Sequence, residues 1–112
     1  MEKIYGGNAE TDGERTRGWL VGEFNEKDSI LHSETAEIKW GIHKAGEART
    51  EWASGDHERT VAILISGRFI MKFHDTEKIL EHPGDYVVWA AGIEHMWTSE
   101  ADSTIITIRW KS

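Results

Sequence analysis

The chain has 112 residues, which is enough for one domain, because two separate cores would each be too small to be stable. Its 20 Asp and Glu residues outnumber its 13 Lys and Arg residues, and the resulting net charge of −7 disfavours binding to nucleic acid or to an anionic membrane surface. The absence of cysteine excludes a disulfide framework and thiolate chemistry, so any metal would need histidine and carboxylate ligands.

The N-terminal segment, residues 1–36, is polar and rich in glycine. It carries neither the apolar run of a signal peptide nor a stretch long enough to span a bilayer, so we expect a cytoplasmic protein. Its one apolar island, residues 19–24, has the alternation of a short edge strand.

Strand patterns become stronger from Glu37 onward. Ile38, Trp40 and Ile42 alternate with polar or small residues, which predicts a half-buried strand. A polar stretch follows at residues 44–59. Residues 61–65 are then continuously apolar and mostly β-branched, which predicts a strand buried on both faces.

Turn-forming residues separate these strands from the next ones. Gly67 lies within a Ser-Gly-Arg turn, which predicts a hairpin between residues 61–65 and 69–73. Pro83 and Gly84 stand side by side, as a type II turn prefers.

The remaining pattern predicts short strands to the end of the chain, at residues 79–80, 86–89, 94–98 and 104–110. In the last of these, the more apolar face consists of Thr104, Ile106, Ile108 and Trp110. The residues expected in the core are Ile63, Leu64, Ile65, Ile106 and Ile108. Short strands without a helical period predict an all-β sandwich or barrel, just wide enough for side chains or one small ligand.

Two stretches resemble the paired signature motifs of the cupin superfamily. The second motif is the clearer, since Gly84-Asp85, an apolar strand, Gly92 and His95 follow the order of the family pattern. Ala90 replaces the usual proline and Ser99 the usual asparagine. The resemblance implies an all-β fold, namely a small single-domain cupin-type barrel or double-stranded β-helix (jelly roll), with residues 37–110 as the barrel.

The first motif is present in outline between Gly46 and Gly67. Where the family has its metal-binding His-x-His pair and glutamate, this chain has Trp52, Ser54 and Thr60. The resemblance therefore implies a cupin with a degenerate metal motif.

The chain is also similar to a narrower group of small bacterial single-domain cupins, some of them labelled signal peptidase I. The shared segments are residues 10–13, 17–19, 38–43, 64–69 and 109–110. The sequence does not support the peptidase label, because it shows neither a membrane anchor nor a Ser/Lys nucleophile pair. Cupins of this size commonly pair through strand edges, so the resemblance implies a homodimer.

His95 is the leading functional candidate. Strand parity places its side chain on the same face as Trp97, so both would look into the barrel. There the imidazole is a metal ligand or a hydrogen-bonding acid or base, and the alternative is a core histidine satisfied by a carbonyl or a water.

Three further residues complete the possible metal ligands: His43, His57 and Glu58. Glu58 shares parity with Thr60, where the family has its inward glutamate, provided that the strand extends so far. The alternative is a solvated loop over residues 55–59. Together with His95, these residues would hold a divalent ion such as Zn, Ni, Fe or Mn.

The tryptophans favour a different site, an apolar pocket with a few polar anchors for a small molecule. Its predicted lining is Trp40, Trp52, Ser54, Thr60, Trp89, His95 and Trp97. Arg109 would pair with an anionic ligand, although an arginine on a strand face more often lies at the surface or at an interface.

Three functions follow as hypotheses. The first is a binding module for a small organic molecule. The second is a metal-dependent enzyme of the oxygenase, isomerase or lyase type, for which the sequence names no catalytic residue. The third is a structural, oligomer-forming β domain with a filled interior.

Overall fold

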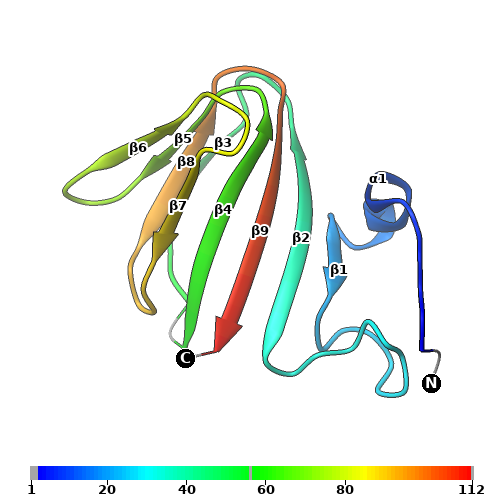
Figure 1. The fold of residues 1–112 in the computed structure, drawn as a ribbon. Coiled ribbons are helices and arrows are strands. Elements are labelled where there is room, and N and C mark those ends of the chain that lie inside the picture. The colour runs from blue at the N-terminus through cyan, green and yellow to red at the C-terminus, as the bar shows by residue number, and fades with distance from the viewer. Residues whose placement is uncertain (1–2, 56, 112) are drawn as a thin grey trace.

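The computed structural model describes residues 3–55 and 57–111, and within them the chain is mainly β-strand (Figure 1). A short helix, α1 (Ala9–Asp12), and a 3-10 turn, η1 (Gly13–Arg15), precede the strands. The strands are β1 (Trp19–Val21), β2 (Ala36–His43), β3 (Ala48–Ala53), β4 (Glu58–Ser66), β5 (Phe69–Lys72), β6 (Glu77–Leu80), β7 (Tyr86–Trp89), β8 (His95–Ser99) and β9 (Ser103–Lys111). The all-β prediction is confirmed. Among the described residues, no helix is long and apolar enough to cross a membrane.

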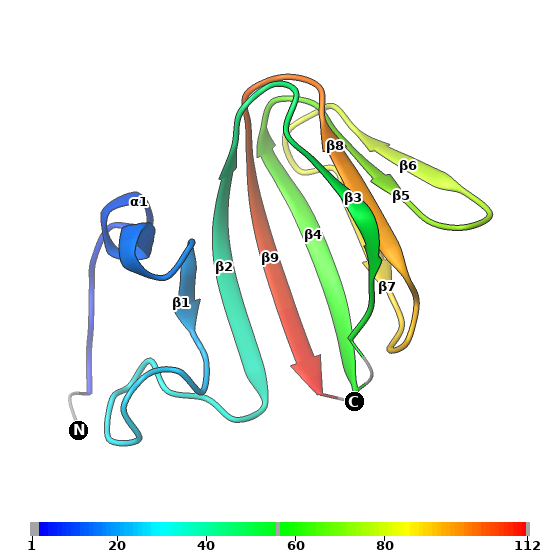
Figure 2. The same ribbon diagram turned by 180° about the vertical axis from the view of Figure 1, so that it is seen from behind.

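The strands form two antiparallel sheets that face each other (Figures 1 and 2). The five-stranded sheet has the order β1-β2-β9-β4-β7, and the four-stranded sheet has the order β3-β8-β5-β6. The long strands β2, β9 and β4 form the middle of the first sheet. Two sheets stacked in this way enclose their inward side chains and form a jelly roll.

The predicted hairpin through Gly67 is wrong, because β4 and β5 lie in different sheets. β4 pairs with β7 and β9, whereas β5 pairs with β6 and β8. Gly67 has a φ of 102°, and a Cβ added to it would lie 2.3 Å from Ser103 Oγ and 2.4 Å from the carbonyl oxygen of Asp102. The chain therefore crosses from one sheet to the other at a position where only glycine fits.

The core lies between the two sheets, so each strand buries only one of its faces. In β4, Ala62 and Leu64 are buried, whereas Ile63 is half-buried and Ile65 is 38% exposed. The prediction of a strand buried on both faces is therefore wrong, and of the predicted core residues only Leu64 is fully buried. The buried hydrophobic residues are Ala62, Leu64, Phe69, Met71, Leu80, Val87, Trp89 and Ile105.

The polar stretch before β4 contains a strand that the sequence pattern does not predict. This strand, β3, pairs with β8, although five of its six residues are exposed and none of them forms an apolar stripe. β4 begins at Glu58, so the strand extends past Thr60 and Glu58 shares its inward face. The alternative interpretation of residues 55–59 as a solvated loop is therefore wrong for Glu58 and Arg59, which belong to β4.

The N-terminal segment adds β1 to the edge of the five-stranded sheet, beside β2. α1 lies next to β1 (Figure 2), and Asn8 caps it by accepting hydrogen bonds from the backbone N–H groups of Glu10 and Thr11. The edge strand predicted at residues 19–24 is shorter than expected, since Gly22 (φ 158°) lies outside it.

Candidate functional site

A cavity of about 290 Å³ lies between the inner faces of the two sheets. Strands of both sheets supply its walls, and the loop after β3 adds Ser54 and Gly55. The lining side chains are those of Lys39, His43, Arg49, Ala53, Ser54, Thr60, Ala62, Phe69, Met71, Trp89, His95, Trp97, Ile105, Thr107 and Arg109. We call this cavity the interior pocket.

One wall of the interior pocket is aromatic. Phe69 and Trp97 are stacked with ring centroids 5.0 Å apart, and the His43 ring lies 4.4 Å from Trp97 and 5.3 Å from Phe69. Burial lowers the pKa of His43, and the nearby Lys39 ammonium lowers it further, against a smaller upward effect of Glu47. His43 is therefore a neutral ring within this wall at pH 7.

His95 lies on β8 beside Trp89, with ring centroids 4.7 Å apart, and its Nδ1 is 3.4 Å from the carbonyl oxygen of Ile93. Burial lowers the pKa of His95, and the positive charges of Arg49 and Arg109 act in the same direction. A neutral imidazole at this position is able to accept a proton from a bound molecule.

Three cations share the interior pocket: Lys39, Arg49 and Arg109. Burial lowers the pKa of Lys39, and repulsion from Arg109, Arg49 and Arg17 lowers it further. As far as the described residues go, no Asp or Glu lines this pocket. A chain with a net charge of −7 thus concentrates positive charge at this pocket, where Arg49 and Arg109 also reach solvent.

Arg109 is held from two sides. Its guanidinium lies 4.5 Å from the ring centroid of Trp19, and the Lys39 ammonium lies 5.5 Å from the same ring. On the other side, Arg109 Nη1 is 4.0 Å from Glu58 Oε2, a buried oxygen that no hydrogen-bond donor reaches among residues 3–55 and 57–111. These contacts keep the guanidinium at the pocket and pair it with one partly buried carboxylate.

The structure brings together five of the seven residues predicted for a small-molecule pocket: Ser54, Thr60, Trp89, His95 and Trp97. The other two lie elsewhere. Trp40 faces the outer side of β2 because Lys39 and His43 occupy its inner side. Trp52 stacks on His74, with ring centroids 3.8 Å apart, and is 38% exposed.

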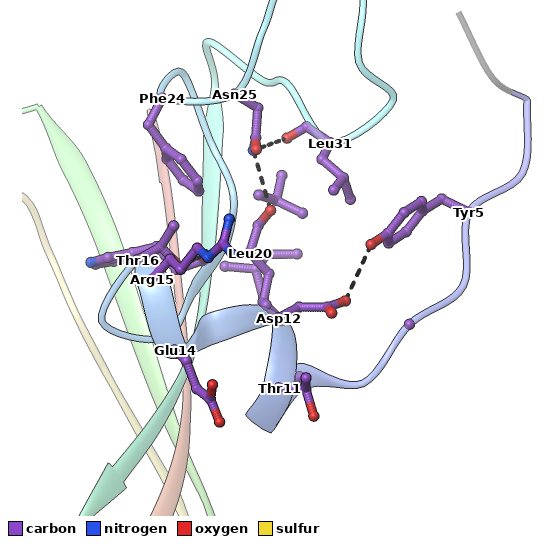
Figure 3. A pocket seen from close by; sticks show the side chains of 15 residues that line it. Tyr5, Thr11, Asp12, Glu14, Arg15, Thr16, Leu20, Phe24, Asn25 and Leu31 are labelled. Carbon is purple, nitrogen blue, oxygen red and sulfur yellow. Dashed lines mark hydrogen bonds between the residues drawn. The ribbon is translucent and has the colours of Figure 1, made fainter.

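A larger cavity, of about 680 Å³, lies outside the sheets between the N-terminal segment and β1 (Figure 3). Its lining includes the apolar side chains of Leu20, Phe24 and Leu31, and Tyr5 donates a hydrogen bond of 3.2 Å to Asp12 across its rim. This cavity also has aromatic residues in its lining, but it has only one cation, Arg15, and no histidine, so the interior pocket is the better candidate site.

Solved structures that superpose on this chain decide the fold family. KdgF from Halomonas sp. matches with a TM-score of 0.64 and 19% identity, covering 75% of this chain and 78% of that protein. A cupin superfamily protein from Desulfitobacterium hafniense matches with a TM-score of 0.64 and 18% identity, covering 71% of each chain. A cupin-2 domain protein from Shewanella frigidimarina matches with a TM-score of 0.61 and 21% identity, covering 79% of this chain and 85% of that one. The chain has the cupin fold. No protein-family model and no curated protein matches the sequence.

The cupin fold raises the question of a metal ion, for which four ligands were predicted: His43, His57, Glu58 and His95. Within the described part of the chain, no three His, Asp or Glu side chains come close enough to hold a metal ion. The carboxylate of Glu58 faces Arg109, His57 is exposed, and the pocket that contains His43 and His95 is lined by three cations. This donor set does not fit a divalent ion, because the cations would repel it.

The cations of the interior pocket were not predicted, because the apolar faces of β2 and β9 were expected to point inward. The inner residues are instead Lys39 and His43 in β2, and Ile105, Thr107 and Arg109 in β9. The signal available in the sequence was that the less apolar face of each of these strands carries a cation, Lys39 in β2 and Arg109 in β9.

We expect the free energy of unfolding to fall as the pH drops below about 6.5, the ordinary pKa of histidine. Because the pKa values of His43 and His95 are lowered in the folded chain, the unfolded chain binds protons there that the folded chain does not. Stability therefore rises with pH up to about 6.5, and these two groups add no further dependence above it.

Urea unfolding at several pH values measures this slope. His95→Gln should flatten it, whereas the control His57→Gln, at an exposed position, should leave it unchanged. An unaltered slope in His95→Gln would contradict the assignment.

Proposed function

We propose that the cupin barrel of this chain binds a small organic anion in the interior pocket. One observation carries the proposal: Lys39, Arg49 and Arg109 line the same cavity, and no carboxylate lines it among the described residues. Like charges that converge repel one another, and the one carboxylate beside them, that of Glu58, balances only one of the three. An anion in the pocket would relieve this repulsion, which favours its binding.

The lining also indicates the kind of anion. An arginine guanidinium presents a planar fork that matches a carboxylate in a bidentate way. The aromatic rings of Phe69, Trp97 and Trp89 in the lining suit an unsaturated or ring-shaped ligand, and the hydroxyl groups of Ser54 and Thr60 are available to orient it. A volume of about 290 Å³ is near the lower end for ligand pockets, which limits the ligand to a small carboxylic acid.

The same cavity favours the binding role over the other two hypotheses. A structural domain with a filled interior would not leave a hollow of this size at its centre. A metal-dependent enzyme would need a donor cluster that the described residues do not form. The neutral imidazole of His95 is available for proton transfer, but binding does not require that step.

Isothermal titration with matched probes tests the proposal. We expect benzoate and succinate to bind, and benzamide, which has the shape of benzoate without its charge, to bind at least about tenfold more weakly. Removing one charged hydrogen-bond donor should reduce affinity by about tenfold or more, so Arg49→Gln should weaken carboxylate binding to that extent.

The control is Arg59→Gln, which removes an exposed arginine on the outer face of β4 and should leave the affinity unchanged. Equal binding of benzoate and benzamide, or equal affinities of Arg49→Gln and Arg59→Gln, would overturn the proposal of an anion site.

A further inference from the structure

Glu58 lies beside the interior pocket, and the proposed anion site does not use its carboxylate. It is the first residue of β4 and pairs in register with Lys111, next to the pair of Thr60 and Arg109 on the same face. Parity gives its side chain the inner face that Thr60 also shares, and Thr60 lines the pocket. The beginning of β4 and the end of β9 lie at the same end of the sheet, beside the loop after β3 (Figure 2). Glu58 therefore lies at the edge of the interior pocket.

Two residues that line the interior pocket are neighbours of this side chain. Arg109 Nη1 is 4.0 Å from Glu58 Oε2. A Cβ added to Gly55 would lie 3.7 Å from Glu58 Cβ and 4.0 Å from Glu58 Oε2. Because Gly55 has no side chain, none at this position separates the carboxylate from the pocket. A ligand that contacts Arg109 would thus lie close to Glu58.

One oxygen of this carboxylate, Glu58 Oε2, lacks a hydrogen-bond donor. The atom is buried, and no donor reaches it from residues 3–55 and 57–111. The distance of 4.0 Å to Arg109 Nη1 permits attraction between the charges but is too long for a hydrogen bond. A buried carboxylate oxygen without a donor destabilises the unliganded protein. Rotation about the last side-chain bond is a broad torsion, so the carboxylate is able to turn this oxygen toward a donor that a ligand brings.

The surroundings of Glu58 are acidic. A second cavity, of about 260 Å³, lies where β2 and β4 begin and β9 ends. We call it the acidic cavity, and its charged lining residues are Glu23, Glu34, Glu37, Glu58, Arg109 and Lys111. Lys111 pairs with Glu23 at 3.6 Å, so the remaining glutamates have Arg109 as the one other cation of this lining. Arg109 also lines the interior pocket, so the charge of the lining changes from positive to negative across this residue.

A metal ion does not account for the acidic cavity. Within the part of the chain that the structure describes, no three His, Asp or Glu side chains come close enough to hold one. An ammonium group needs only one carboxylate as its acceptor and is attracted by the other negative charges at longer range. A second carboxylate on the ligand would instead be repelled here. The charges therefore favour a ligand that is negative at one end and positive at the other.

We propose that the organic acid bound by this chain is an amino acid in its zwitterionic form. Its carboxylate contacts the cations of the interior pocket, and its ammonium group donates a hydrogen bond to Glu58 at the border with the acidic cavity. This inference rests on the proposed anion site and adds the charge at the other end of the ligand. An ammonium group has three donors, so it supplies the one that Glu58 lacks.

Isothermal titration at neutral pH with three matched probes tests the ammonium group. The probes are meta-methylbenzoate, meta-(hydroxymethyl)benzoate and meta-(aminomethyl)benzoate, together with their para isomers, and within each isomer they differ in a single group. We expect the aminomethyl compound of at least one isomer to bind at least about tenfold more tightly than the methyl compound, because it adds a charged hydrogen bond. The hydroxymethyl compound, which offers a donor without a charge, should lie between them.

Glu58→Gln removes the charge of the acceptor at nearly unchanged size. It should reduce the preference for the aminomethyl over the methyl compound to about twofold or less, and it should strengthen binding of the methyl compound because Arg109 loses its competing partner. Glu58→Asp, which keeps the charge, should retain part of the preference. The control is Glu77→Gln, at an exposed position of β6, which should retain all of it. Circular dichroism should show that the three variants are folded.

The zwitterion and the anion site fail in different ways. If the methyl compounds bind and the ammonium group adds nothing, the zwitterion is excluded and the anion site remains. If none of the benzoates binds, both are wrong. An equal preference in Glu58→Gln and Glu77→Gln, or a hydroxymethyl compound that binds more tightly than the aminomethyl one, would contradict the role of Glu58 as the acceptor of an ammonium group.

Discussion

Lys39→Met is expected to raise the melting temperature of the unliganded protein and to weaken its binding of small carboxylates. The ammonium of Lys39 is partly buried and is repelled by Arg109, Arg49 and Arg17, which together lower its pKa. Methionine has a similar length, keeps the contact with the Trp19 ring and carries no charge. We expect the melting temperature to rise by about 3 °C and carboxylate affinity to fall by about tenfold or more.

Lys78→Met is the matched control, because Lys78 is exposed on β6 and does not line the interior pocket. It should change neither quantity. Differential scanning calorimetry without ligand and titration with benzoate measure the two effects separately. A Lys39→Met protein that is less stable, or that binds carboxylates as tightly as the wild type, would show that this lysine serves the fold and not the ligand.

Gly67→Ala is expected to cost at least about 3 kcal/mol of the free energy of unfolding, a large share of the total stability of a small domain. The left-handed backbone alone costs about 1–2 kcal/mol for a residue with a Cβ. In addition, the new methyl group would meet Ser103 Oγ, Ser103 Cα and the carbonyl oxygen of Asp102 at 2.3–2.6 Å. The backbone atoms among these can move only if the crossing between the sheets opens.

Gly84→Ala separates the two contributions. Gly84 has a φ of 95°, close to the 102° of Gly67, but an added Cβ would meet nothing within 4 Å. The free energy of unfolding of Gly84→Ala should therefore fall by only about 1–2 kcal/mol, which is the cost of the left-handed backbone. Urea unfolding of both variants measures the difference, and equal losses would show that the contact with Ser103 is unimportant.

Much of the fold was predictable because strand alternation and turn residues are local signals. The strands around Ile38, Val87 and Ile106 were found in this way, and so was the turn at Gly84. Strand pairing is not local. The turn residues around Gly67 are compatible with a hairpin and also with a crossing to the other sheet, so they do not distinguish the two connections. The contact of Gly67 with Ser103 distinguishes them, and 36 positions separate these two residues.

The candidate site was predictable in its aromatic part but not in its charges. His95 and Trp97 were placed by the second cupin motif and by parity. Parity alone does not say which face of a strand is inward, and the usual preference for the apolar face gave the wrong answer for β9. There the outward residues Ile106, Ile108 and Trp110 are more hydrophobic than the pocket side, on which Thr107 and Arg109 lie. In this chain the more apolar face of β9 points outward and the charged face lines the cavity, which is the reverse of the usual arrangement.

The position of Trp19 has a practical consequence for any work on this protein. β1 has only three residues, and its register with β2 is irregular. Yet the indole of Trp19 contacts both the Lys39 ammonium and the Arg109 guanidinium, and so helps to position them. A deletion that removes Trp19 would therefore release both cations from this ring, and measurements of ligand affinity call for a chain that keeps β1.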